Sequence, residues 1–164
     1  MKPSSIVKSL LFLGFIPSLA WGTSLRSQIL AQIAETHSSI QVVIYEINSP
    51  EMAQALASAA HRGVDVRVIV DEARSNKPSS QEAFLKSEGV AVKKIAADGR
   101  NLMHDKFVLF DRSLALTPSY NRSIRSLRET GSAEQLFTDE PTLVRQFQKE
   151  FEAVWHAADY ARLP

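Results

Sequence analysis

A histidine and a lysine two residues apart give this chain its clearest chemical signature. They lie in segment 101–111, which reads NLMHDKFVLFD. If this segment is extended, the side chains of His104 and Lys106 leave the same face of a sheet. The lysine ammonium neutralises an oxyanion such as a phosphate, and the imidazole can act as a nucleophile or carry a proton. The pair therefore predicts phosphate chemistry, although its spacing alone fits an edge-strand histidine beside a solvated lysine equally well.

The elements that must position this pair alternate between helical and strand patterns. Helices are predicted from Leu25 to about His37, from Pro50 after an N-cap at Ser49 to just before Gly63, and from a capping box at Ser79 and Glu82 to Gly89. A nearly continuous β-branched run predicts a strand over 40–47 that is buried on both faces, and extended patterns predict further strands over 64–70 and 90–95. Strands separated by helices indicate right-handed crossovers and an α/β fold. We expect a mixed, largely parallel sheet with helices on both faces.

The second half predicts short strands followed by one long helix. The strands cover 107–110, 114–117 and 135–138, and Asp111 ends the first of them. The helix begins near Pro141, with Thr138 or Asp139 as its cap, and its apolar side chains recur at four-residue spacing: Leu143, Phe147, Phe151 and Trp155. No linker or internal repeat divides residues 23–164, so we expect one domain.

Residues 1–22 resemble an export signal peptide. Lys2 and Lys8 flank a short apolar run, and the sequence AWG at 20–22 fits a cleavage site between small residues. The alternatives are an uncleaved anchor or a buried first helix. Cleavage would leave 142 residues and change the formal charge from +1 to −1, because two lysines and no acidic residue are lost. We therefore expect a periplasmic or secreted protein.

Composition excludes several classes of site. The chain has 164 residues, of which 45% are hydrophobic and 23% charged, as in an ordinary soluble globular domain. It contains no cysteine, which rules out disulfides, thiolate metal sites and cysteine nucleophiles. Nineteen basic residues against eighteen acidic ones give no overall attraction for a polyanion. Binding of nucleic acid would need a local basic patch.

The pair belongs to a longer pattern that resembles the phospholipase D superfamily. His104, Lys106 and Asp111 fit the motif His-x-Lys-x4-Asp, and SYN at 119–121 stands where the family has Gly-Ser-x-Asn. The sequence YEIN from Tyr45 and the stretch 61–71 are similar to the family's segments ahead of the motif, and Glu134 resembles its later acidic residue. The match runs from about Ile40 to the C-terminus. It is closest to small exported bacterial endonucleases with one motif per chain.

The resemblance implies a mechanism and a set of site residues. It makes His104 the nucleophile that forms a phosphohistidine, and it supplies the second histidine from His104 of another copy in a homodimer. Lys106, Ser119 and Asn121 would hold the phosphoryl oxygens, and Asp111 is expected to brace its loop. Glu134, or alternatively Glu129, would accept a hydrogen bond from the His104 ring. No metal or other cofactor is implied.

The substrate is predicted from the residues that follow the motif. Arg122 and Arg125, with Arg128, are spaced three apart and would track a nucleic-acid backbone, although a solvated face explains the spacing equally well. We therefore expect a nuclease acting on DNA, with RNA as a further substrate. The alternatives are a phospholipase D acting on phospholipid head groups, at a membrane, and a catalytically weak nucleic-acid-binding module. Pro118 stands where the family has glycine and supplies no backbone N–H to a phosphate.

Overall fold

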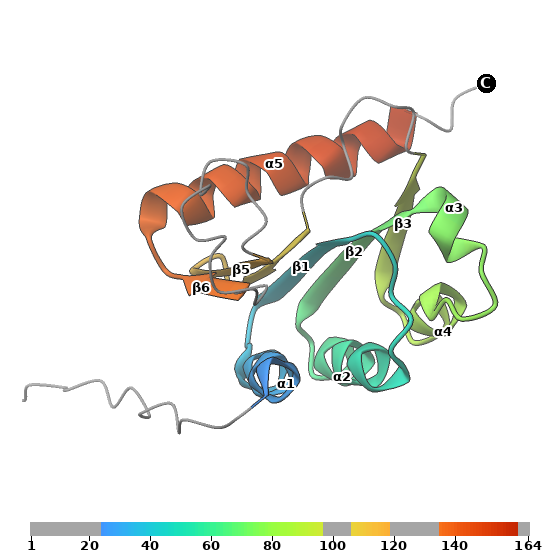
Figure 1. Ribbon diagram of the computed structural model, residues 1–164, viewed down its shortest axis with the longest axis horizontal. Helices are drawn as coiled ribbons and strands as arrows, with labels where there is room; N and C mark the ends of the chain where they lie inside the picture. The colour runs from blue at the N-terminus through green and yellow to red at the C-terminus, as the bar shows by residue number, and fades with distance from the viewer. Residues whose placement is uncertain (1–23, 97–105, 119–134, 161–164) are drawn as a thin grey trace, which may run out of the picture.

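A single six-stranded sheet forms the centre of the computed structural model, which describes residues 24–96, 106–118 and 135–160 (Figure 1). The strand order is β3-β2-β1-β4-β5-β6. The strands are β1 (Ser39–Ile44), β2 (Asp65–Asp71), β3 (Ala91–Ile95), β4 (Phe107–Phe110), β5 (Leu114–Pro118) and β6 (Gln135–Thr138). β1 pairs in parallel with β2, and β2 with β3, whereas the pairs β1–β4, β4–β5 and β5–β6 are antiparallel. Four of the six strands, β1, β2, β3 and β5, therefore run in the same direction.

Helices cover both faces of this sheet, which confirms the predicted α/β class. In Figure 1, α1, α2 and α4 lie on one side and the long α5 crosses the other. The helices are α1 (Leu25–Glu35), α2 (Pro50–His61), α3 (Glu72–Ser75), α4 (Glu82–Ser87) and α5 (Pro141–Tyr160). Each face has its own core. In β1, for example, Val42 packs in the core that includes α2, and Val43 packs in the core that includes α5.

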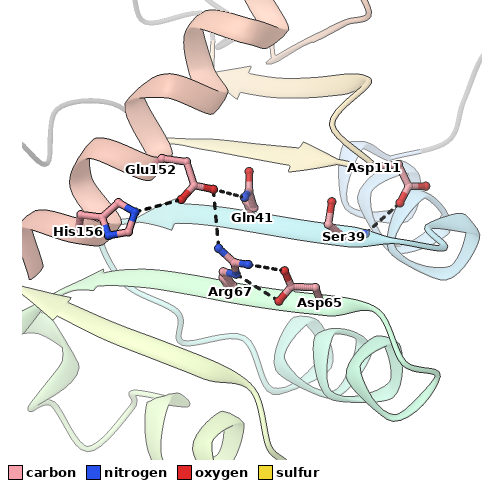
Figure 2. A network of polar contacts seen from close by, with 7 residues as sticks. All are labelled: Ser39, Gln41, Asp65, Arg67, Asp111, Glu152 and His156. Carbon is pink, nitrogen blue, oxygen red and sulfur yellow. Dashed lines mark hydrogen bonds and ion pairs between the residues drawn. The ribbon is translucent and has the colours of Figure 1, made fainter. Parts of the chain in front are cut away.

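A polar network ties α5 to the two central parallel strands (Figure 2). Gln41 of β1 is 1% exposed, and its Nε2 donates to Oε1 of Glu152 at 3.2 Å. The same carboxylate oxygen lies 3.7 Å from Nη1 of Arg67, whose other amino group pairs with Asp65 at 2.7 Å. This network supplements the apolar contacts of α5 and satisfies the N–H side of the buried Gln41 amide, whereas Gln41 Oε1 has no hydrogen-bond partner among the described residues.

The boundaries of α2 follow from local sequence signals. Ser49 Oγ accepts a hydrogen bond from the Met52 amide at 3.4 Å, and Pro50 occupies the first turn. Gly63, just beyond the helix, has a φ of +92°, a conformation that favours glycine. The predicted helix at 50–62 is thus confirmed together with its cap.

Gly63 provides a test of this helix end. We expect Gly63→Ala to lower the free energy of unfolding by about 1–2 kcal/mol, because the new Cβ is strained at positive φ even though no neighbouring atom lies within 4 Å. Urea denaturation would measure the change. Gly63→Asn should lose less, since asparagine tolerates this conformation, and an equal loss in both variants would contradict strain as the cause.

The predicted capping box at the start of α4 is wrong, and so is the predicted end of the first strand. The Ser79 and Glu82 capping box does not form: Ser79 Oγ donates to Glu46 at 3.1 Å, and no side chain caps α4 at Gln81. Glu82 is instead 6% exposed and pairs with Lys86 at 2.6 Å and Lys94 at 2.9 Å. Two ion pairs hold this carboxylate better than one backbone amide would, because burial would otherwise penalise its charge.

The first strand is also shorter than predicted, ending at Ile44 instead of Ile47. The chain leaves the sheet at Tyr45, whose carbonyl accepts from the Asp71 amide at 3.4 Å. The Ile47 carbonyl then accepts from the Gln81 amide at 2.9 Å, which replaces a strand partner. Hydrophobicity continues past the strand because Ile47 is buried against the helices.

The predicted cap and buried stripe of α5 need correction. The carboxylate of Glu140, and neither Thr138 nor Asp139, accepts from the Thr142 and Leu143 amides at 3.0 and 2.7 Å. Leu143 is 40% exposed, whereas Val144, Phe151, Val154 and Ala158 are buried. Each four-residue step along an α-helix turns about 40° past a full circle, so three such steps carry a stripe about 120° around the helix. Leu143 has therefore rotated out of the core that Phe151 enters.

Candidate active site

Lys106 lies at the edge of the sheet where β1 ends and β4 begins. Val43 of β1 pairs with Phe107 of β4, so Lys106 comes just before the strand and next to the end of β1. Its side chain is exposed. Its Nζ lies 5.6 Å from the ring centre of Tyr45, the residue that follows β1. The strand pairing therefore places the lysine of the motif beside Tyr45, the aromatic residue that follows β1.

Several other strand ends meet at this edge, which we call the carboxyl edge. β1, β2, β3 and β5 all end here, and β4 and β6 begin here, as their pairings require. Pro118, the last residue of β5, pairs with Gln135, the first residue of β6. Ligands of open α/β sheets bind outside the carboxyl ends of the strands. The carboxyl edge is thus where the fold favours a site.

Most of the predicted site residues fall outside the part of the chain that the structure describes. These are His104, Ser119, Asn121, Arg122, Arg125 and Glu134, together with the alternative Glu129. The described residues adjoining them are Lys106, Pro118 and Gln135, each at the carboxyl edge. The roles of the predicted residues stay predictions.

A second cation beside Tyr45 was missed by the sequence predictions. Arg74, in the short helix α3, has its Cζ 4.6 Å from the Tyr45 ring centre. Asp71 ends β2 and caps α3, with its Oδ1 accepting from the Arg74 amide at 3.0 Å. A hydrogen bond with the Tyr45 side chain raises the pKa of Arg74 above its ordinary value, against the effect of desolvation. The sequence signal that could have pointed to Arg74 is its position in the chain, because α3 comes directly after β2, a strand that ends at the carboxyl edge.

Glu46, the acidic residue that follows Tyr45, already has two polar partners. Glu46 accepts from Ser79 Oγ at 3.1 Å and lies 4.0 Å from Lys77 Nζ. Among residues 24–96, 106–118 and 135–160, no carboxylate forms an ion pair with Lys106 or Arg74 within 4.0 Å. Two positive charges therefore share one aromatic ring without a bound carboxylate from the described chain.

Asp111 lies at the opposite edge of the sheet. Its carboxylate accepts from the backbone amides of His37, Ser38 and Ser39 at 3.1, 2.6 and 3.1 Å, and from Ser38 Oγ at 2.7 Å. Figure 2 shows it beside Ser39, at the start of β1. These hydrogen bonds outweigh partial burial and lower the pKa of Asp111 to about 2.

Asp111 consequently holds a turn and does not meet Lys106. Four residues of β4 separate the two, a span of roughly 16 Å at the usual rise of a strand. The backbone turns sharply here, with positive φ at Asp111 (49°) and Arg112 (56°). The carboxylate fastens this turn to the segment that enters β1, which fixes where β4 sits against β1.

The described histidines do not lie with Lys106. The His61 side chain is 60% exposed, and its Nε2 lies 3.3 Å from Oε2 of Glu88. The His156 side chain is 69% exposed, and its Nε2 lies 3.8 Å from Oε2 of Glu152. His37 contributes its backbone amide to Asp111. Within the described ranges, no three His, Asp or Glu side chains gather as a metal site would require. The helices in those ranges include none with the length and apolar character of a membrane span.

Comparison with known proteins identifies the kind of domain that this fold and edge form. The family described as "Cardiolipin synthase, PLD-like domain" matches residues 29–155. The chain therefore belongs to this phospholipase D-like family.

Individual relatives agree. The chain is 35% identical over 135 residues to a mitochondrial cardiolipin hydrolase of Xenopus laevis, covering 82% of this chain and 63% of the relative. The chain thus spans about three-fifths of that curated relative. It is also similar to the crystal structure of Nuc, a phospholipase D family member from Salmonella typhimurium, with a TM-score of 0.66 and 26% identity over 81% of this chain and 88% of Nuc. NucT from Helicobacter pylori shares the fold, with a TM-score of 0.64 and 21% identity over 80% of this chain and 87% of NucT.

Proposed function

We propose that this chain is a metal-independent phosphodiesterase, and specifically a non-specific endonuclease that hydrolyses DNA and also RNA. The reaction passes through a phosphohistidine on His104, at a site that two copies of the chain share. The observation that carries this proposal is the pair of cations at the carboxyl edge. Lys106 and Arg74 flank one ring there, without a carboxylate partner among the described residues. Such a pair suits a polyanion with charges at short intervals.

The exposed surface of residues 24–96, 106–118 and 135–160 favours nucleic acid over lipid as the substrate. An enzyme that works on a phospholipid surface needs an apolar face to enter it. Over the described ranges, Leu143 is the large hydrophobic side chain that is exposed, and it lies on α5 away from the carboxyl edge.

Phospholipid hydrolysis is the second candidate. The names of the relatives favour it, since a 35% identical relative is a cardiolipin hydrolase and two others from Dictyostelium discoideum are named phospholipase D. The chemistry is shared, because both substrates are phosphodiesters. The substrate alone distinguishes the two candidates.

In the proposed mechanism, a ring nitrogen of His104 attacks phosphorus and expels the leaving oxygen. His104 of the second copy gives that oxygen a proton and later takes one from water, which attacks the phosphohistidine and frees the first histidine. Lys106, Ser119 and Asn121 stabilise the charge on the phosphoryl oxygens, and Glu134 orients the His104 ring. Protein side chains supply all of the positive charge, so no metal ion takes part.

We also propose that residues 1–22 direct export, which places the enzyme in the periplasm or outside the cell. The basic flank, short apolar run and small residues of that segment support this location. The homodimer follows from the mechanism, because one motif supplies one catalytic histidine.

The proposal predicts nicking of plasmid DNA in excess chelator. Purified protein would be incubated with plasmid, RNA, phosphatidylcholine and cardiolipin, each with EDTA, while light scattering measures its mass. We expect the plasmid to be cleaved as fast with EDTA as without it. Light scattering should give the mass of a dimer. Head-group release without nicking would establish the lipid candidate, and loss of cleavage in EDTA would refute the metal-free mechanism. A monomer with full activity would refute the shared site, and DNA binding without turnover would indicate a binding module.

A further inference from the structure

Arg74 has no role in the motif, yet it is built into the same edge as Lys106. The two residues come from different parts of the fold: Lys106 precedes β4, and Arg74 follows β2. Tyr45, at the end of the intervening strand β1, lies between them in sheet order and contacts both cations. The arrangement therefore extends positive charge from the motif strand toward β2.

The contacts of Arg74 hold it in place while leaving its guanidinium able to bind an anion. Its backbone amide donates to Asp71, and the Asp71 amide donates in turn to the Tyr45 carbonyl. The guanidinium lies over the Tyr45 ring and forms one hydrogen bond with the Tyr45 side chain, which leaves most of its five N–H donors for an anion. Glu46 and Asp71 attract the Arg74 charge but form no ion pair with it within 4.0 Å, so the guanidinium can still approach an anion. An arginine suits a phosphate in particular, since its planar fork donates two parallel hydrogen bonds.

The strand order indicates whether Arg74 would bind the reacting phosphate or a neighbouring one. β2 and β4 are separated by β1, so their axes lie about 10 Å apart at the usual spacing of strands. Lys106 is the cation on the motif strand and would hold the reacting phosphate. Arg74 is displaced from it along the sheet, in the direction that a continuing polynucleotide backbone would take.

We propose that Arg74 binds a phosphate adjacent to the one that is cleaved, and that Tyr45 is the platform that holds Arg74 beside Lys106. This inference rests on the proposed function for the identity of the reacting phosphate. Arg74 is then a substrate-binding residue that favours polynucleotides over molecules with a single phosphodiester. Tyr45 is a positioning residue.

Arg74→Ala tests the contact. DNA binding would be measured by fluorescence anisotropy over a range of salt concentrations in the His104→Asn variant, in which turnover does not consume the probe. We expect Arg74→Ala to weaken binding roughly tenfold and to reduce the slope of log K against log salt by about 1. In the active protein it should raise KM for DNA more than it lowers kcat, and it should leave hydrolysis of bis(p-nitrophenyl) phosphate within twofold.

Matched variants separate the contact from general effects of charge and ring. Arg145→Ala removes the same charge from an exposed position on α5 and should change neither measurement. Tyr45→Leu, which removes both the ring and the hydroxyl, should reproduce the weaker binding. Tyr45→Phe, which keeps the ring but loses the hydrogen bond to Arg74, should have an intermediate affinity. Arg74→Lys should restore part of it.

Each other result has a definite meaning. Unchanged DNA affinity in Arg74→Ala, or an equal loss with the single phosphodiester, would overturn the assignment to an adjacent phosphate. A protein that hydrolyses none of the substrates but loses DNA affinity on Arg74→Ala would refute the proposed function and support the contact. Absence of DNA binding by the His104→Asn variant would overturn the inference.

Discussion

Replacing Lys106 with methionine is expected to lower kcat for phosphodiester hydrolysis about 10²- to 10³-fold. The Lys106 ammonium lies at the carboxyl edge and would offset charge that grows on the phosphoryl oxygens in the transition state. Methionine is an unbranched side chain only one atom shorter than lysine, and it lacks the ammonium charge and its N–H donors. His104→Asn, which removes the nucleophile itself, should leave less than about a thousandth of the wild-type rate. Single-turnover cleavage of a labelled duplex would measure both effects.

The side chain of Lys106 is exposed, so a loss of folding cannot account for this result. Lys149→Met makes the same change at an exposed position on α5 and should retain the wild-type rate. Both lysine variants should unfold at the wild-type urea concentration. If Lys106→Met kept more than a tenth of the wild-type kcat, Lys106 would not stabilise the transition state in the way proposed.

The fold was predictable because its main signals are local or periodic. The nearly continuous β-branched run that begins at Ile40 identifies a strand that is buried on both faces, and Ser49 with Pro50 identifies a helix start. The errors arise where a distant partner decides. Ser79 fits a capping box, but it bonds Glu46 instead, and Glu82 pairs with Lys94 of another element. No pattern along the chain reveals such partners.

The site was predictable to a different extent. The motif spacing singles out Lys106, which the structure places just before β4. The predicted shared face with His104 falls outside the described residues and stays a prediction. The spacing cannot find Arg74, which reaches Tyr45 only through the pairing of β1 with β2 and the cap that Asp71 provides for α3. The spacing also hides the fact that Lys106 and Asp111, the two ends of one motif, lie at opposite edges of the sheet. The two ends of the motif therefore differ in role: Lys106 is proposed to bind phosphate, whereas Asp111 holds a turn.

Because Asp111 holds a turn, we expect Asp111→Asn to lower the free energy of unfolding by about 2 kcal/mol at pH 7. The carboxylate accepts four hydrogen bonds from residues 37–39, and an asparagine amide would turn a donor toward some of those donors. Urea denaturation would measure the loss. Asp139→Asn, at an exposed position whose side chain forms no hydrogen bond or ion pair with the described residues, should lose less than about 1 kcal/mol.

The effect of Asp111 should also depend on pH. Its folded-state pKa of about 2 lies below its ordinary value of 3.8, so its stabilisation is complete above that ordinary value and declines as the pH falls toward 2. After allowance for solvent around this partly exposed group, the declining part amounts to about 1–2 kcal/mol. The difference in stability between wild type and Asp111→Asn should therefore narrow between pH 5 and pH 2.5. A constant difference would contradict the assignment to the charged carboxylate. Because Asp111 lies at the edge away from Lys106, the folded variant should keep the wild-type kcat, and a loss of kcat without a loss of stability would move Asp111 from the turn to the chemistry.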